Sequence, residues 1–404
     1  MKKVFSLLMV AVMVLSCVAL VGCGNENAGT ASDMDVKVGF IFLHDENSTY
    51  DKNFMDAANA VKEKLNLTDA QVIFKTNIPE GNECYEAAAD LADQGCNIVF
   101  ANSFGHEPYI LKAAKEFPDV QFCHSTGTMA HTEKLPNFHN AFASIYEGRY
   151  LAGVAAGLKL NEMIANGEFT PEEAKIGYVG AYTYAEVISG YTSFFLGARS
   201  ICPTATMEVQ FTGSWYDEAL EKEAATKLIS NNCKLISQHA DSMGAPTACE
   251  NAKIPNVSYN GSTVKACPNT FIVSSRIDWT PYYEYAITNC VNGEEIAYDW
   301  CKGLEEGSVV LTDVNEKAAA AGTVEKLAEV EKALKAGEVH VFDISTFTVG
   351  GKALDSYLAD VDTDAAYTPD TEVVSDGYFH ESEYRSAPYF DVRIDGITLL
   401  NEMF

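Results

Sequence analysis

The run Val36-Lys-Val-Gly-Phe-Ile-Phe-Leu43 decides the fold, because it is apolar, rich in β-forming residues and as long as one buried strand. Apolar residues at helical spacing follow it from Phe54 to Leu65. A strand and helix that alternate in this way along a chain are typical of a parallel sheet covered by helices on both faces.

The alternation continues on both sides of a long helix expected over 145–165. Before it, the pattern predicts strands at 72–74, 97–101 and 120–123, and helices at 82–94 and 109–117. After it come strands at 176–180, 207–211, 235–238, 257–259 and 271–274, with helices at 185–200, 217–231, 246–251 and 281–291. Two further helices are expected, one that begins at Thr170-Pro171 with Glu173 completing the capping pattern, and one over 323–336. Two successive parallel sheets imply an α/β protein of two lobes, with a ligand cleft between them at the carboxyl ends of the strands.

The loops that follow the predicted strands repeat one kind of residue pair, an aromatic ring beside a polar group. In a cleft, such rings sandwich a flat ligand, each stack adding roughly 0.5–1.5 kcal/mol beyond area burial. Buried Asp or Asn side chains then read the ligand edge by hydrogen bonds. Plain packing is the alternative for any one ring. The residues concerned are Tyr50, Asn102, Phe104, Trp215, Asp241 and Trp279.

The first residues have the pattern of a bacterial export signal. Lys2 and Lys3 precede an apolar run over 4–21 that ends in Leu20-Val-Gly-Cys23. This lipobox-like end predicts a signal peptide over 1–22, lipid on Cys23 and a flexible tether over 23–35. The protein is then expected outside the cytoplasm, anchored to the cell membrane. An uncleaved transmembrane helix or an ordinary secretory signal are the alternatives.

The composition narrows the function classes. A net charge of −29 repels nucleic acid and anionic lipid. No nucleophile elbow, zinc-protease motif or phosphate-binding glycine loop occurs, so no catalytic residue, cofactor or metal is assigned. His239 and Asp241 suggest a metal or acid–base pair, or ligand hydrogen bonds, and binding is preferred because no third partner lies nearby in sequence. Asp360, Asp362 and Asp364 resemble the start of a calcium loop, against a solvated acidic loop as the simpler reading.

Nine cysteines remain beyond Cys17 in the signal and the lipid-bearing Cys23. An exported protein can use them in disulfides, and an odd number leaves at least one unpaired. Their pairing is left open. The candidates near one another in sequence are Cys202 with Cys233, Cys249 with Cys267, and Cys290 with Cys301.

Over about Val36 to Phe342 the chain resembles the basic membrane protein family, the substrate-binding lipoproteins of purine nucleoside ABC importers. The matching stretches are Asn102-Ser-Phe-Gly-His-Glu-Pro, Phe122-Cys-His-Ser-Thr-Gly127, Ile145-Tyr-Glu-Gly-Arg-Tyr-Leu-Ala-Gly153, Gly213-Ser-Trp-Tyr-Asp217 and Gln238-His-Ala-Asp-Ser242.

This resemblance implies the type I periplasmic-binding fold, with two Rossmann-like lobes joined by three crossovers. The first lobe would comprise 36–144 plus about 275–310, and the second 145–274 plus about 311–404, including an irregular acidic and aromatic tail. Carried over by position, Phe104 and Trp215 are aromatic walls, Asp241 binds polar ligand atoms, and Glu147 and Trp279 line the cleft.

The resemblance further implies a purine nucleoside or base as ligand, and an ABC permease and ATPase as partners. Many members carry an aspartate near Asn260 and Ser262, where this chain has none, so a free base or another flat heterocycle stays open alongside a nucleoside. Two other functions remain as alternatives: a component that presents ligand to a membrane receptor, and an extracytoplasmic purine-processing enzyme.

Overall fold

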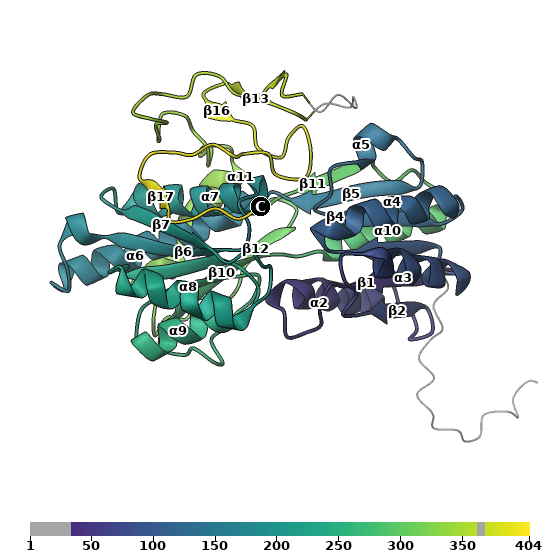
Figure 1. The fold of residues 1–404 in the computed structure, drawn as a ribbon, viewed down its shortest axis with the longest axis horizontal. Helices are drawn as coiled ribbons and strands as arrows, with labels where there is room; N and C mark the ends of the chain where they lie inside the picture. The colour runs from purple at the N-terminus through teal and green to yellow at the C-terminus, as the bar shows by residue number, and fades with distance from the viewer. Residues whose placement is uncertain (1–33, 362–367) are drawn as a thin grey trace, which may run out of the picture.

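The computed structural model describes residues 34–361 and 368–404, so the predicted signal, Cys23 and the acidic residues 362–364 lie outside the described residues. The chain forms two sheets that lie end to end, each with helices on both faces (Figure 1). The first sheet is parallel throughout and has the order β11-β5-β4-β3-β1-β2. Its strands are β1 (Val38–Ile41), β2 (Val72–Lys75), β3 (Ile98–Ala101), β4 (Gln121–Ser125), β5 (Phe138–Ala143) and β11 (Asp299–Lys302).

The second sheet has the order β12-β10-β9-β8-β6-β7-β17. All its pairings are parallel except that of β12 with β10, which is antiparallel. Its strands are β6 (Lys175–Gly180), β7 (Thr206–Phe211), β8 (Leu235–His239), β9 (Asn256–Tyr259), β10 (Phe271–Ile277), β12 (Val309–Leu311) and β17 (Ile397–Leu399).

Local sequence explains where the helices begin and how closely they pack. The Ser48 side chain caps α2 by accepting from the Asp51 amide, and Asp217 caps α8 by accepting from the Leu220 amide. Helices α6 and α7 touch at Gly153, where a Cβ would lie 2.0 Å from the Phe194 carbonyl oxygen. The helices are α2 (Thr49–Lys64), α3 (Asn82–Asp93), α4 (Glu107–Glu116), α5 (Ala130–Glu133), α6 (Ile145–Ala165), α7 (Ala185–Ile201), α8 (Glu218–Ser230), α9 (Gly244–Ala252), α10 (Thr280–Asn292) and α11 (Thr323–Lys335).

The chain crosses between the two lobes three times, after β5, after β10 and between β11 and β12. This arrangement confirms the predicted α/β fold of two lobes with parallel sheets. β10 continues to Ile277 and β12 begins at Val309, and both belong to the second sheet. The crossings therefore lie slightly inside the segment 275–310 assigned to the first lobe.

The helix start predicted at Thr170 is confirmed, and the cysteines whose pairing the sequence left open are free in the described residues. The Thr170 capping pattern is present, but it begins only a three-residue 3₁₀ helix over Pro171–Glu173, because strand β6 starts at Lys175. No disulfide joins the nine cysteines of the described residues, all of which are free. Seven of them are buried, where a thiol packs as a small apolar group.

The described part of the C-terminal segment, residues 345–361 and 368–404, is more ordered than its sequence predicts. It runs over both lobes in Figure 1, through the short strands β13 (Leu358–Ala359), β14 (Thr371–Glu372), β15 (Val374–Ser375) and β16 (Tyr378–Phe379) and on to β17. Its rings form a small core, in which Phe390 stacks on Phe342 at 4.2 Å between ring centroids.

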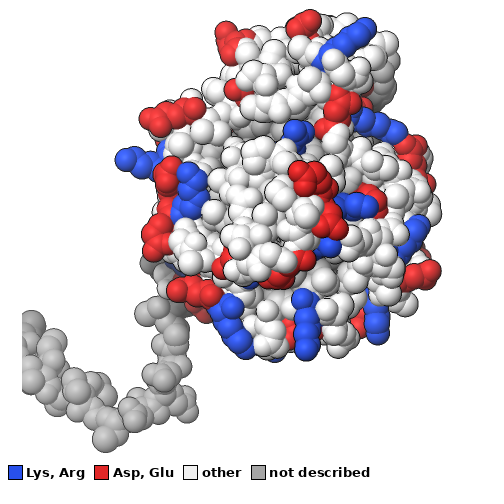
Figure 2. All heavy atoms as spheres, turned by 90° about the vertical axis from the view of Figure 1, so that its left-hand side faces the viewer, with Lys and Arg blue, Asp and Glu red and all other residues white. Residues whose placement is uncertain are grey.

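Acidic and basic side chains are interspersed over the end of the second lobe (Figure 2). The described residues include no group of three His, Cys, Asp or Glu placed to hold a metal ion. Within residues 34–361 and 368–404, no helix is both long and apolar enough to cross a membrane.

Candidate ligand-binding site

A pocket lies where the carboxyl ends of strands from both sheets face each other, with an empty volume of about 360 Å³. Five lining residues come from each lobe. The first lobe contributes Leu43, Tyr50, Ser103, Phe104 and Thr126, and the second contributes Glu186, Trp215, His239, Asp241 and Tyr259.

Aromatic rings wall the pocket from both lobes. Tyr50 is held in place because its hydroxyl donates to the Asn102 carbonyl oxygen at 2.6 Å. The Trp215 ring packs edge-on against Tyr182, with 5.1 Å between centroids, and is half-buried. Phe104 is 43% exposed, so its ring has free surface on which a flat ligand can stack.

Asp241 joins the two lobes and presents its carboxyl to the pocket. Its main-chain oxygen accepts from both the amide and the hydroxyl of Thr49, each at 3.1 Å, across the cleft. Burial raises the pKa of this carboxyl well above its usual range, and the nearby Glu221 raises it further. The neutral form is thereby favoured, which both donates and accepts hydrogen bonds.

Glu186 and His239 form a second polar group on the same side. His239 Nε2 lies 3.4 Å from Glu186 Oε1, and its ring lies 4.5 Å from the ring of Tyr259. Burial lowers the pKa of His239, which favours a neutral imidazole, and its Nδ1 has no partner among the described residues. No Lys or Arg lines the pocket, so its polar edge consists of acids, a histidine and hydroxyl groups.

The backbone is strained where Thr126 meets the pocket. Thr126 has a φ of +73°, a conformation unusual for a β-branched residue. Its hydroxyl oxygen is buried and has no partner among the described residues. Strain together with an unpaired polar atom is characteristic of positions that meet a ligand.

Four of the seven predicted site residues line this pocket: Tyr50, Phe104, Trp215 and Asp241. Asn102 lies directly behind it, where its side chain accepts from the Leu43 amide at 3.1 Å and donates to Asp51 at 2.8 Å.

The structure does not bring Trp279 or Glu147 to the pocket. Trp279 is 1% exposed and stacks on Phe54 at 4.4 Å, in the core beneath Tyr50. Glu147 lies at the crossover between β11 and β12, where it accepts from the Leu304 amide at 2.8 Å, and burial raises the pKa of its carboxyl to about 7.

Sequence reasoning missed Thr126, Glu186 and Tyr259 as pocket residues. Tyr259 ends a strand and Glu186 begins the helix after another, so both follow the rule that led to the other residues. Thr126 lies inside the Phe122–Gly127 stretch that carried the family resemblance.

Two α/β lobes that enclose a pocket at their facing strand ends define the class of two-lobed solute-binding proteins. A solved structure with this fold, a solute-binding protein of an ABC transporter system from Conexibacter woesei, aligns with a TM-score of 0.61 at 21% identity. It covers 76% of this chain and 98% of that chain.

The family description "ABC transporter substrate-binding protein PnrA-like" (Bmp) matches residues 38–344. A purine-binding protein of Brucella abortus is 31% identical over 76% of this chain and 83% of its own length. A putative ABC transporter glucose-binding protein of Haloferax volcanii is 30% identical over 54% of this chain and 52% of its own length. The chain belongs to the Bmp family of ABC transporter substrate-binding proteins, and it is therefore a binding protein and not an enzyme.

Proposed function

We propose that this protein captures a purine nucleoside or purine base between its lobes for an ABC importer. The observation that carries the proposal is the combination, in one interlobe pocket, of four aromatic rings with a small set of hydrogen-bonding groups. The rings suit a flat heterocycle, and the name of the Brucella abortus relative supports a purine.

The polar groups suit the edge of a purine, which carries both donors and acceptors. Asp241 in its neutral form offers one donor and further acceptor capacity, and Glu186 accepts. Asn260 follows β9 near the position where family members have an aspartate, and its buried side chain is a hydrogen-bond partner of the Asp241 carboxyl. This amide supplies a donor toward a ribose, a different contact from the one a carboxylate makes.

Lobe closure is the proposed mechanism. A ligand that contacts both lobes stabilises the closed form by the difference between its affinities for the closed and open forms. In the structure, the Thr49–Asp241 bonds join the two lobes across the cleft. The closed protein then delivers its ligand to the permease and ATPase of the importer. Lipid on Cys23, as the Leu20-Val-Gly-Cys23 pattern predicts, holds the binding protein at the membrane surface.

A hexose is the second candidate, because the Haloferax volcanii relative is named as a putative glucose-binding protein and tryptophan rings also stack on sugars. Titration calorimetry of the protein without its first 33 residues separates the candidates. The panel comprises adenosine, guanosine, adenine, guanine, uridine and glucose. We expect micromolar or tighter binding of at least one purine and none of uridine or glucose at the same concentration; glucose binding without purine binding refutes the proposal.

A further inference from the structure

The C-terminal segment lies beyond the family match, which ends at residue 344, and it bridges the lobes beside the pocket. Its attachment to the second lobe is extensive. β17 extends the second sheet beside β7, the Asn401 side chain bonds the Phe211 backbone at 2.8 and 3.0 Å, and the Thr183 amide donates to the Met403 oxygen at 2.7 Å. Toward the first lobe, the Ser386 amide donates to Asp299 of β11 at 2.7 Å.

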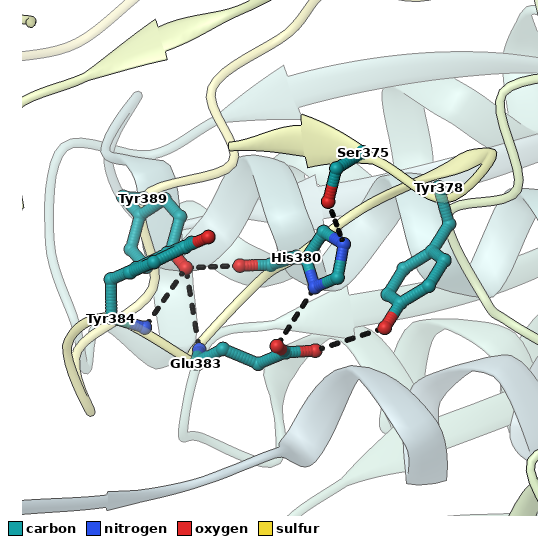
Figure 3. A network of polar contacts seen from close by, with 6 residues as sticks. All are labelled: Ser375, Tyr378, His380, Glu383, Tyr384 and Tyr389. Atoms are coloured by element: carbon teal, nitrogen blue, oxygen red, sulfur yellow. Dashed lines mark hydrogen bonds and ion pairs between the residues drawn. The ribbon is translucent and has the colours of Figure 1, made fainter. Parts of the chain in front are cut away.

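A network of polar contacts joins the loop over 380–389 to Ser375 of β15 and Tyr378 of β16 (Figure 3). The Tyr389 hydroxyl donates to the His380 oxygen and accepts from the amides of Glu383 and Tyr384, both at 3.3 Å. His380 in turn lies 2.8 Å from the Glu383 carboxylate and 2.7 Å from the Ser375 hydroxyl. The loop over 380–389 therefore presents its side chains from a fixed position.

This loop walls a second cavity, which we call the vestibule, of about 1110 Å³ empty volume. The vestibule shares Phe104, Thr126 and Glu186 with the inner pocket, so the two cavities adjoin. The segment adds Arg385 and Arg393 to its lining. No Lys or Arg is among the described residues that line the inner pocket, so the two cavities differ in their cationic groups.

The two arginines of the vestibule differ in how their charges are balanced. Arg393 forms an ion pair with Glu402, and the vestibule residue Asp391 accepts from the Tyr357 hydroxyl. Arg385 is half-buried, and its hydrogen bonds within residues 34–361 and 368–404 go to the main-chain oxygens of Asp360 at 3.0 Å and Ala387 at 3.3 Å. Among the described residues it has no ion pair, although Asp299, Asp360 and Glu107 act on it at longer range.

A partly desolvated guanidinium with free donors is well suited to an anion, because its planar fork matches phosphate oxygens. We propose that the vestibule extends the ligand site and that Arg385 binds the phosphate of a purine nucleoside monophosphate whose base lies in the inner pocket. This inference rests on the proposed function. The described residues that line the inner pocket include no Lys or Arg to pair with a phosphate, which disfavours the reverse orientation.

The test compares adenosine and guanosine with their 5′-monophosphates by calorimetry. For the wild-type protein we expect each monophosphate to bind within threefold of its nucleoside, or more tightly. Arg385→Gln should weaken monophosphate binding at least tenfold and leave nucleoside binding within threefold. Arg385→Lys keeps the positive charge and loses the planar fork of the guanidinium. Its affinity for the monophosphates should lie between those of the wild type and Arg385→Gln. Lys227→Gln on α8, whose side chain contacts Gln210, is the matched control for loss of one positive charge and should change neither affinity.

The outcomes separate this inference from the proposed function. If nucleosides bind and monophosphates bind at least a hundredfold more weakly to the wild type, the anion site is refuted and the proposed function stands. If Arg385→Gln weakens nucleoside and monophosphate binding equally at an unchanged thermal midpoint, Arg385 is structural and the inference is refuted. The inference is also refuted if Arg385→Gln and Arg385→Lys both unfold and the wild type does not prefer the monophosphate. If neither class binds, both proposals fail.

Discussion

Replacing Trp215 by alanine removes one aromatic wall of the pocket and leaves both sheets intact. If stacking on the ligand buries roughly 60 Å² of apolar surface, about 25 cal/mol per Å² gives about 1.5 kcal/mol. The aromatic pair adds about 0.5–1.5 kcal/mol. The expected loss is thus about 2–3 kcal/mol, a weakening of Kd by roughly 30- to 140-fold. Because Trp215 is half-buried and its ring packs on Tyr182 and Tyr184, we expect the thermal midpoint to fall by only a few degrees.

Calorimetry with the tightest purine of the panel measures this change. Trp300→Ala is the matched control, because Trp300 is also half-buried and packs on Tyr282 in the first lobe, away from the pocket. The control should bind within threefold of the wild type. A Trp215→Ala protein that remains folded and also binds within threefold would refute the assignment of this ring as a wall.

Three further predictions concern stability and thiol chemistry. Burial raises the pKa of Glu381 from 4.5 to about 7, so ionisation of this carboxyl destabilises the folded state as the pH rises from 4.5 to 7. Glu381→Gln should therefore raise the free energy of unfolding by up to about 3 kcal/mol at pH 8 and by less at pH 5. Chemical unfolding at both pH values measures this difference. Trp279→Ala should cost about 3–5 kcal/mol of unfolding free energy, a larger loss of stability than Trp215→Ala causes, since the ring lies in the core; an unchanged unfolding midpoint would contradict that placement. In guanidinium without reductant, a thiol reagent should label all nine cysteines of the described residues, and fewer would indicate disulfides.

The strand–helix alternation was predictable because several buried strands are apolar runs, as in β1 (VGFI) and β3 (IVFA). Strand β5 was not predicted, since His139 and Asn140 interrupt its apolar pattern. Both are buried with partners far along the chain, His139 with Gln121 at 2.8 Å and Asn140 with the Ala130 amide at 2.7 Å. Local sequence does not reveal such partners, nor does it reveal that β17 completes the second sheet from the C-terminal segment.

The candidate site was predictable to the extent that strand ends were placed correctly. Trp215 and Asp241 follow strands whose ends were predicted within one residue, and both line the pocket. Trp279 follows β10, which continues three residues beyond its predicted end, so Trp279 occupies the N-cap position of α10 and its ring packs in the core on Phe54. Glu186 escaped notice because a glutamate in the first turn of a helix is common for electrostatic reasons alone.

The central claim is that the interlobe pocket selects a purine. Native mass spectrometry of the folded protein, after incubation with an equimolar mixture of purine nucleosides, purine bases, pyrimidine nucleosides and hexoses, tests it most directly. The account predicts one bound molecule per chain with the mass of a purine base or nucleoside, and its loss in Trp215→Ala. A bound hexose or pyrimidine nucleoside, with no purine retained, would contradict it.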